Sequence, residues 1–274
     1  MSRPDWLLSV IKTLFPRKPE YGRLSRLPGM GWLFEKLFFD GDHLITLPRG
    51  RTIAIGQPVD PGRQMVLPLK LMDYFIDRME DHFIMDFCVC RRSMNCADYP
   101  VDLGCLFMGE ATRNINPDWG RPVSKEEARA HIRRCEEHGL IHFIGKSKLD
   151  TQWLGIGPGE KLLTICNCCP CCCITRSLPY AALNLSEKLV RAPGVTVQVG
   201  DNCLGCGHCV DSHICFANAI SMEADRAVIS DDCRGCGRCV SACPAEAIHL
   251  SIDPEVFLET SIASLESIID LPGT

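Results

Sequence analysis

Apolar side chains recur every three or four residues in several stretches of this 274-residue chain. The clearest stretch spans residues 68–83, where the apolar positions are Leu69, Met72, Phe75, Ile76, Met79 and Phe83. This spacing places them on one face of a helix that Pro68 opens. We expect the helix to run directly into the cysteines that follow it and to support them.

A second helix is predicted to begin at Ser124. Glu127 stands three residues on, which completes a capping box, and Gly139 follows as a stop signal. Strands are expected at residues 140–144 and 161–165, and a helix followed by two strands is half of a winged-helix shape. The helix carries three arginines, but four glutamates dilute their charge, so we expect no nucleic-acid binding.

The rest of the pattern predicts shorter elements. They are apolar helices at residues 6–15 and 31–39, two short strands within 43–55 joined at Pro48–Gly50, a helical linker at 178–190 and a strand at 195–199. The chain ends in an amphipathic helix over residues 254–271, with an apolar face of Leu258, Ile262, Leu265 and Ile269. We expect this face to pack on the C-terminal sheet or on another subunit.

The composition adds nineteen cysteines to this picture. Several are adjacent in the sequence and no secretory signal precedes them, which argues against a secreted disulfide framework. No stretch approaches the ~18 apolar residues of a membrane span. We therefore expect a protein of a reducing cytoplasm, typical of an anaerobe.

Charge is unevenly distributed along the chain. Residues 201–274 hold twelve acidic and three basic side chains, a balance of −9, whereas the whole chain carries −5. The remainder, residues 1–200, is therefore +4. An acidic C-terminal end could dock on a basic partner surface, although ordinary solubility would account for the same charge.

Eight cysteines between residues 203 and 243 carry the strongest chemical signal. Two Cys-x2-Cys-x2-Cys runs begin 30 residues apart, and each is followed by a fourth cysteine: Cys203, Cys206, Cys209 and Cys215, then Cys233, Cys236, Cys239 and Cys243. Thiolates at this spacing suit a cubane iron–sulfur cluster. Gly205, Gly207, Gly235 and Gly237 let the backbone curl around such a cluster and direct N–H groups at its sulfurs.

This repeat resembles the bacterial-type dicluster ferredoxin over residues 195–252. In that family the fourth cysteine of each run ligates the other cluster. The resemblance implies a first [4Fe–4S] cluster on Cys203, Cys206, Cys209 and Cys243, and a second on Cys233, Cys236, Cys239 and Cys215. The first run departs from the family pattern, because five residues separate Cys209 from Cys215 and Phe216 replaces the usual proline. A pair of zinc sites is the alternative, but zinc ribbons rarely add a third cysteine to each run.

Ten more cysteines stand upstream in two groups. They are Cys88, Cys90, Cys96 and Cys105, then Cys166, Cys168, Cys169, Cys171, Cys172 and Cys173. Adjacent cysteines do not readily form a disulfide with each other. We expect the two groups to converge on a shared site with at least one additional iron–sulfur cluster, not every cysteine being a ligand. A zinc site, or reduced cysteines buried as small hydrophobic residues, are the alternatives.

Residues 84–176 also resemble a cysteine module that precedes ferredoxin-like tails in iron–sulfur proteins of anaerobes. The shared features are Cys-x-Cys-Arg at Cys88–Arg91, the cysteines Cys96 and Cys105, Glu136–Leu140, and the run Cys166–Cys173. The resemblance implies an iron–sulfur protein and no specific reaction.

The predicted fold class is α+β, with a C-terminal dicluster ferredoxin-like domain and an N-terminal helical, winged-helix-like cysteine-rich module. Five segments are expected: a basic extension with apolar helices (1–60), the cysteine-rich metal-binding module (61–176), a helical linker (177–194), the ferredoxin domain (195–252) and a C-terminal helix (253–274).

The predicted function is one-electron transfer between redox protein partners, as a carrier or as a subunit of an oxidoreductase. The alternatives are an oxidoreductase with a catalytic cluster at the N-terminal cysteines and an iron–sulfur transcriptional sensor. Residues 6–15 are a candidate for peripheral membrane contact. A short helix packed on the protein body or on a partner subunit is the favoured interpretation of the same stretch.

Overall fold

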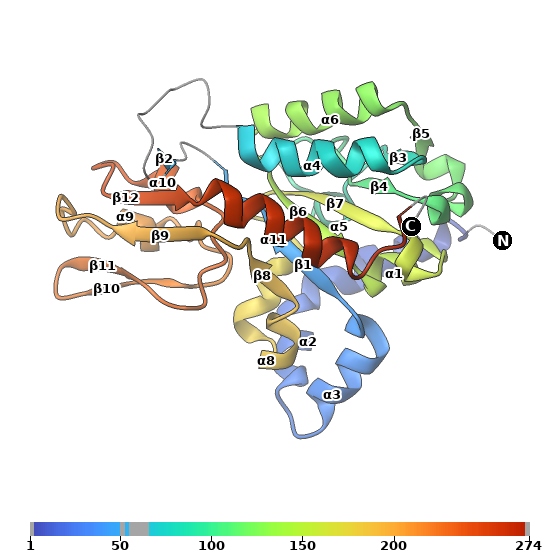
Figure 1. The fold of residues 1–274 in the computed structure, drawn as a ribbon. Coiled ribbons are helices and arrows are strands. Elements are labelled where there is room, and N and C mark those ends of the chain that lie inside the picture. The colour runs from blue at the N-terminus through green and yellow to red at the C-terminus, as the bar shows by residue number, and fades with distance from the viewer. Residues whose placement is uncertain (1–2, 50–52, 55–65, 272–274) are drawn as a thin grey trace.

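The computed structural model describes residues 3–49, 53–54 and 66–271. Its main feature is a seven-stranded sheet with the order β5-β3-β4-β7-β6-β1-β8 (Figure 1). The strands are β5 (Gly120–Pro122), β3 (His82–Met85), β4 (Leu106–Met108), β7 (Leu163–Cys168), β6 (Ile141–Lys146), β1 (His43–Thr46) and β8 (Leu189–Arg191). Neighbouring strands are antiparallel except β1 and β8. Strands β3, β4 and β6 are buried except at Lys146, and most of their residues are apolar.

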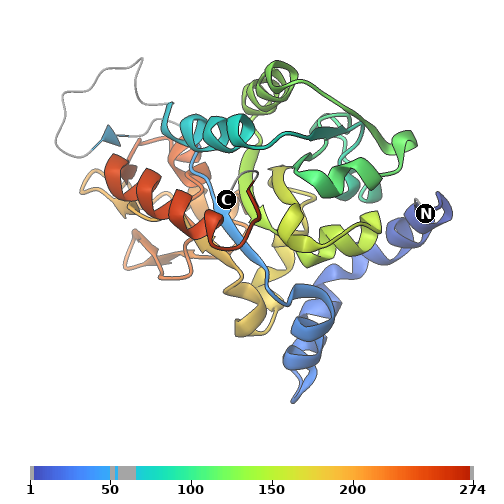
Figure 2. The same ribbon diagram turned by 45° about the vertical axis from the view of Figure 1, so that its right-hand side comes forward.

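Two long helices lie side by side above this sheet, α4 (Val66–Arg78) and α6 (Lys125–Glu137) (Figures 1 and 2). Ser124 and Glu127 form the predicted capping box at the start of α6. Below the sheet lie α1 (Trp6–Leu14), η1 (Phe15–Arg17), α2 (Lys18–Ser25), α3 (Met30–Phe34) and the π-helical η2 (Glu35–Phe39).

The C-terminal part consists of two strand–helix–strand units. The first is β9 (Val195–Val199), α9 (His208–Asp211) and β10 (Ile220–Glu223), and the second is β11 (Arg226–Ile229), α10 (Arg238–Ala242) and β12 (Ile248–Ile252). β12 pairs antiparallel with β9 and parallel with β2 (Ile53–Ala54), while β10 pairs with β11. The last helix, α11 (Pro254–Glu266), lies against α4.

Short helices connect these elements. They are α5 (Val89–Ser93), η3 (Glu110–Asn114), η4 (Pro117–Trp119), α7 (Lys148–Leu154), η5 (Gly159–Lys161), η6 (Ile174–Tyr180) and α8 (Leu183–Ser186).

One apolar core joins the C-terminal units to the rest of the protein. It includes Phe75 of α4, Ile144 of the large sheet, Leu250 of β12 and Phe257 of α11, all at most 1% exposed. The two cysteine-bearing parts therefore pack against each other through a shared interior. The division into five segments stays a prediction.

The α+β class is confirmed, and several sequence-based expectations need correction. The helix after Pro68 ends at Arg78, because residues 82–85 pair with β4 as strand β3, so a strand separates the helix from the cysteines. The winged-helix detail is not confirmed, since β6 and β7 pair as neighbours but belong to the sheet of seven.

Two further expectations differ from the structure. The linker at residues 178–190 is not a single helix, because β8 pairs with β1 after the short elements η6 and α8. Of the face predicted for the last helix, Leu265 and Ile269 are buried, whereas Leu258 and Ile262 are only partly buried. Phe257 and Ser261, one residue before each of these two, take the buried positions in α11. The contact of α11 with α4 turns this face inward.

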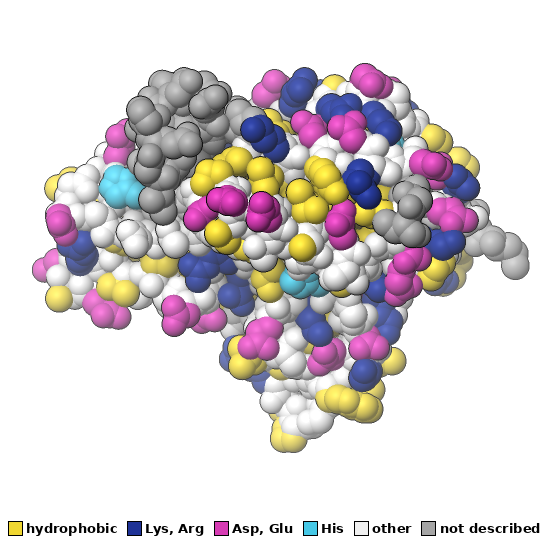
Figure 3. Space-filling view, in the orientation of Figure 1, with side chains coloured by type: hydrophobic (Ala, Val, Ile, Leu, Met, Phe, Trp, Pro, Cys, Tyr) yellow, Lys and Arg dark blue, Asp and Glu magenta, His cyan; other side chains and the backbone are white. Residues whose placement is uncertain are grey.

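The N-terminal helices leave large apolar side chains exposed. Helix α1 buries no residue, and Trp6 and Trp32 are each 64% exposed. The lobe formed by α2, α3 and α8 projects from the body, and apolar side chains lie at its tip (Figure 3). No helix among the described residues is long and apolar enough to cross a membrane.

Candidate metal centres

Four of the C-terminal cysteines surround a small apolar cavity. Cys203, Cys206 and Cys209 come from the loop and first turn of α9, and Cys243 follows α10. Met222 and Ile248 complete the lining of this cavity, which is partly open to solvent. The cavity thus joins three cysteines of the first run to the last cysteine of the second.

Backbone N–H groups are directed at these sulfurs. The N–H groups of Ala227 and Gly205 donate to Cys203 and lower the pKa of its thiol. The N–H of Ala247 donates to the Cys243 sulfur at 3.3 Å. Such bonds favour the thiolate, the form that ligates a metal.

The other four C-terminal cysteines form a matching group. Burial, with a smaller contribution from the nearby thiolates of Cys215 and Cys233, raises the pKa of the Cys236 thiol to about 11. Burial also raises the pKa of Cys239, and Cys236, Cys233 and Cys215 add to that shift. Four thiols crowded in this way are costly to ionise without a cation, and a metal would supply the missing positive charge.

The two C-terminal groups repeat the same local geometry. The N–H of Ala219 donates to Cys215 at 3.3 Å, as Ala247 does to Cys243, and Asn218 and Glu246 occupy matching positions with positive φ. Gly205 and Gly237 have φ values of +66° and +75°. A Cβ at Gly237 would lie 2.3 Å from the Arg49 carbonyl oxygen, so glycine is required there for contact as well as for conformation.

The longer spacing of the first run forms a contact with the N-terminal cysteines. His213, with φ +49°, lies in the extra residues between Cys209 and Cys215. The Arg176 guanidinium donates to the His213 carbonyl at 3.0 Å and to the Pro170 carbonyl at 3.3 Å. Arg176 thereby connects this loop to the turn that carries the late N-terminal cysteines.

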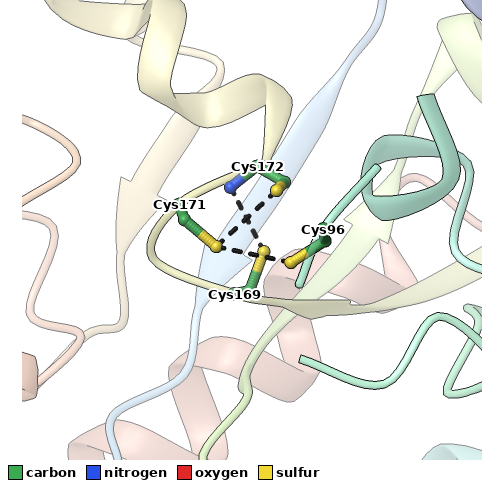
Figure 4. Close-up of side chains that lie close together, drawn as sticks. All are labelled: Cys96, Cys169, Cys171 and Cys172. Atoms are coloured by element: carbon green, nitrogen blue, oxygen red, sulfur yellow. Dashed lines mark hydrogen bonds between the residues drawn. The ribbon is translucent and has the colours of Figure 1, made fainter. Parts of the chain in front are cut away.

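The ten N-terminal cysteines separate into two sets. We call the first the Cys96 group: Cys96, Cys169, Cys171 and Cys172, whose sulfur atoms all lie within 4.8 Å of one another (Figure 4). Cys96 follows α5, and the other three lie on the turn after β7. The Cys171 sulfur is 3.6 Å from the sulfurs of both Cys96 and Cys172.

We call the remaining six the Cys88 group: Cys88, Cys90, Cys105, Cys166, Cys168 and Cys173. The Cys173 sulfur lies 3.1 Å from that of Cys168, and the Cys105 sulfur lies 3.8 Å from that of Cys166. Cys90 is hydrogen-bonded to Cys88 and Cys173, and Cys166 to Cys168. The contacts join all six thiols into one continuous cluster.

The nineteenth cysteine, Cys135, belongs to neither set. It is buried in α6, and burial raises the pKa of its thiol to about 12. It behaves as a small hydrophobic residue.

Buried cations stand beside the N-terminal thiols. The Arg91 side chain is completely buried and donates to the carbonyl oxygens of Asn167 and Leu103. Burial opposes its charge, but Cys88, Cys168 and Cys169 raise the pKa of Arg91 above its ordinary value. Among the described residues no carboxylate forms an ion pair with Arg91. An anionic metal–thiolate centre would supply the counter-charge.

Lys18 of α2 is a second such cation and is 8% exposed. Burial lowers the pKa of Lys18, while Cys90, Cys173 and Cys172 oppose that shift. Lys18 has no distinguishing signal in the sequence, and Arg91 stands out there only as part of Cys-x-Cys-Arg. A buried charge cannot be recognised from sequence unless its partners are already known.

The Cys88 group is in contact with the second C-terminal group. Arg238, which lies between Cys236 and Cys239, is 3% exposed and donates to the Cys168 carbonyl at 2.5 Å. Cys236, Cys168 and Cys173 share one apolar cluster with Phe216. Phe216 stands where the resemblance expects proline, and its ring packs on Phe143 of β6 with centroids 5.6 Å apart.

Comparison with known proteins adds one finding. Residues 211–252 match the model of the LdpA Fe-S cluster-binding domain. That segment contains Cys215, Cys233, Cys236, Cys239 and Cys243. No curated protein and no solved structure matches the chain. Together with the cysteine groups, the match identifies an iron–sulfur protein.

Proposed function

We propose that this iron–sulfur protein transfers single electrons between redox proteins. The observation that carries the proposal is the crossed grouping of the eight C-terminal cysteines. Each group takes three thiols from one run and one from the other, as two [4Fe–4S] clusters of the dicluster type require. Such clusters supply one-electron chemistry and need no acid, base or nucleophile from the protein.

The protein's residues prepare these sites in three ways. The loops present four thiols to one cavity, N–H groups donate to sulfur, and the left-handed glycines let the backbone approach closely. The two groups are also adjacent. Helix α10 carries Cys239 of the second group, and Cys243 of the first group follows about one helical turn later. Short separation is the main requirement for electron exchange between centres.

The exposure of the cysteines suits a relay. Cys206 of the first C-terminal group and Cys171 of the Cys96 group are exposed, whereas Cys236, Cys168 and Cys173 are buried. The buried centres would thus be protected while an outer centre remains accessible to a partner. Leu204, 76% exposed, lies beside Cys206 and offers an apolar contact there.

A basic partner surface is the expected match for this end. Asp211 and Asp225 lie beside the glycines of the Cys203–Cys209 loop. Electrostatic attraction would speed the encounter, and its rate would fall as salt screens the charges. The setting we propose is a reducing cytoplasm, in keeping with nineteen cysteines that are all free.

The exposed N-terminal helices are a second proposed contact surface. Trp6 and Trp32 are exposed, and the basic residues Lys12 of α1 and Lys36 of η2 follow them in the sequence. Such a combination suits an anionic membrane surface. Sedimentation with anionic vesicles would retain the wild type more than a Trp6→Ser, Trp32→Ser variant, and equal sedimentation would leave contact with a partner subunit as the role of these helices.

The crossed ligand assignment is tested with serine variants of the fourth cysteines. Cys243→Ser should alter the cluster held by Cys203, Cys206 and Cys209, and Cys215→Ser the other one. Electron paramagnetic resonance (EPR) of anaerobically purified, reduced protein should lose a different signal in each variant, while Cys135→Ser retains both. Loss of the same signal in both variants would contradict the crossing, and zinc in place of iron would contradict the proposed function.

A catalytic role at the Cys96 group is less favoured by its geometry. Its four thiols can occupy four coordination positions, which leaves none open for a substrate. A substrate-dependent change in the EPR spectrum would be the sign of the enzymatic alternative. Retardation of DNA at low salt would be the sign of a transcriptional sensor.

A further inference from the structure

The late N-terminal cysteines include two adjacent pairs, Cys168–Cys169 and Cys172–Cys173, and the structure splits both pairs. Cys168 and Cys173 belong to the Cys88 group, while Cys169 and Cys172 belong to the Cys96 group. Successive side chains of an extended segment point to opposite sides, which explains how Cys168 at the end of β7 and Cys169 after it separate. The sequence-based expectation of one shared site does not anticipate this division.

The two groups differ in the number of thiols. Four sulfurs, as in the Cys96 group, complete the coordination of one tetrahedral ion. Six sulfurs, as in the Cys88 group, exceed it, so a polynuclear centre is needed to use them. Because no sulfur belongs to both groups, each could be filled without the other.

The spacing in the Cys96 group is also that of a single ion. A tetrahedral ion with metal–sulfur bonds of about 2.3 Å holds its sulfurs about 3.8 Å apart. The Cys171 sulfur lies 3.6 Å from two others, and all four lie within 4.8 Å. A cubane keeps its cysteines further apart, because four irons and four sulfides lie between them. In the Cys88 group the close sulfurs are paired, Cys168 with Cys173 at 3.1 Å and Cys105 with Cys166 at 3.8 Å, and the six thiols extend as a chain.

The surroundings of the Cys96 group suit an ion bound to four thiolates. The N–H of Cys172 donates to the Cys169 sulfur at 3.3 Å. Four thiolates around a divalent ion carry a net charge of about −2, and Arg91 lies buried close to Cys169. Cys169 and Cys172 are buried while Cys171 is exposed, so the site is reachable from solvent on one side.

We propose that the N-terminal module holds two separate metal centres of different nuclearity. The Cys96 group binds one tetrahedral ion, Zn²⁺ or Fe²⁺, and the Cys88 group binds the additional iron–sulfur cluster. The second half rests on the proposed function, whereas the single-ion site does not. In this arrangement Cys168–Cys169 and Cys172–Cys173 connect the two centres by one peptide each.

The test counts iron, zinc and acid-labile sulfide per chain in full-length, anaerobically purified protein. Cys96→Ser, Cys171→Ser is compared with Cys105→Ser, Cys166→Ser, Cys173→Ser, which leaves the Cys88 group three thiols, fewer than the four that a cubane takes. Cys135→Ser is the control for loss of a thiol outside both groups. The first variant should lose about one metal ion and no sulfide, and the second about four irons with their sulfide. The control should equal the wild type.

Other results would overturn the proposal. Loss of about four irons with sulfide from the Cys96, Cys171 variant would mean a cubane there, and an unchanged metal content would mean that the group binds no ion. Loss of the same metal from both variants would mean one shared centre. Cobalt substitution gives a second readout, because Co²⁺ bound by four thiolates absorbs intensely, and that absorption should be missing only from the Cys96, Cys171 variant. A failure of the proposed function would give a different result from a failure of this proposal, since the C-terminal clusters would then be missing from the wild type.

Discussion

Among single residues, the cysteines explain why positively charged side chains are buried in this protein. Arg91 is fully buried with carbonyl partners and no paired carboxylate among the described residues, and it lies among Cys88, Cys168 and Cys169. An unpaired buried guanidinium would strongly destabilise the fold. The arrangement is stable if the thiols around it are anionic, as they are when they bind a metal.

Replacement of Arg91 tests that interpretation. Arg91→Met should reduce the metal retained by the N-terminal cysteines and destabilise the loaded protein by about 3–5 kcal/mol, because the anionic centres lose their buried partner. Metal analysis and thermal unfolding under anaerobic conditions give both quantities. Arg92→Met is the matched control, since Arg92 is exposed and packs on the Phe87 ring. Equal metal content in the two variants would contradict the assigned role of Arg91.

Asp42 provides a pH-dependent prediction away from the cysteines. Its carboxylate accepts from the Lys148 N–H at 2.5 Å, and burial raises its pKa from 3.8 to about 7. Its contribution to stability is therefore fully present below pH ~4 and is lost as the pH rises to ~7, because the folded state must then bury the charge.

Asp42→Asn removes that cost and keeps the acceptor oxygen. The free energy of unfolding of this variant should exceed that of the wild type by an amount that grows with pH and levels off above ~7, at no more than about 4 kcal/mol. Chemical denaturation between pH ~5.5 and ~8 measures it. Asp40→Asn, at an exposed position, should show no such trend. A constant difference across this range would refute the raised pKa.

At the scale of elements, the cysteine-bearing loops depend on glycines in left-handed conformations. The sequence predicted this for Gly205, Gly207, Gly235 and Gly237, and all four have positive φ. Strand β9 and helix α6 with its capping box were also predictable, because their signals are local. The end of α4, strand β8 and the burial of Phe257 and Ser261 in α11 were not, since each is decided by a partner distant in sequence.

Gly237→Ala separates steric contact from backbone strain. The added Cβ would meet the Arg49 carbonyl at 2.3 Å, whereas a Cβ at Gly29, with a similar φ of +77°, would meet nothing within 4 Å. Gly29→Ala should therefore cost only about 1–2 kcal/mol, the price of a left-handed conformation. Gly237→Ala should cost more and lower the iron content, as measured by anaerobic unfolding and iron analysis. Equal losses in the two variants would show that the contact with Arg49 is unimportant.

At the scale of the whole molecule, the four cysteine groups form one connected system. The C-terminal groups share α10, Arg238 joins the second of them to Cys168, and adjacent cysteines join the Cys88 and Cys96 groups. The sequence predicted the eight C-terminal cysteines as ligands from their spacing. It could not divide the other ten, because strand β7 and the turn after it direct neighbouring cysteines to different sides.

This connection predicts how the metal centres respond to oxidation. On exposure to air, the first C-terminal group, which includes the exposed Cys206, should lose iron before the Cys88 group, in which no cysteine is exposed. The decay of separate EPR signals over time measures the order, with Cys135→Ser as a control for thiol oxidation elsewhere. Faster loss from the Cys88 group would contradict the burial that separates the centres.

The most direct test of electron transfer is an anaerobic reductive titration of the wild-type protein, followed by absorbance and EPR. The two C-terminal clusters and the cluster in the Cys88 group should each accept one electron, about three per chain, and return them to an artificial acceptor. Uptake of fewer than two electrons per chain, or no reversible reduction, would contradict the assignment of this protein as an electron carrier.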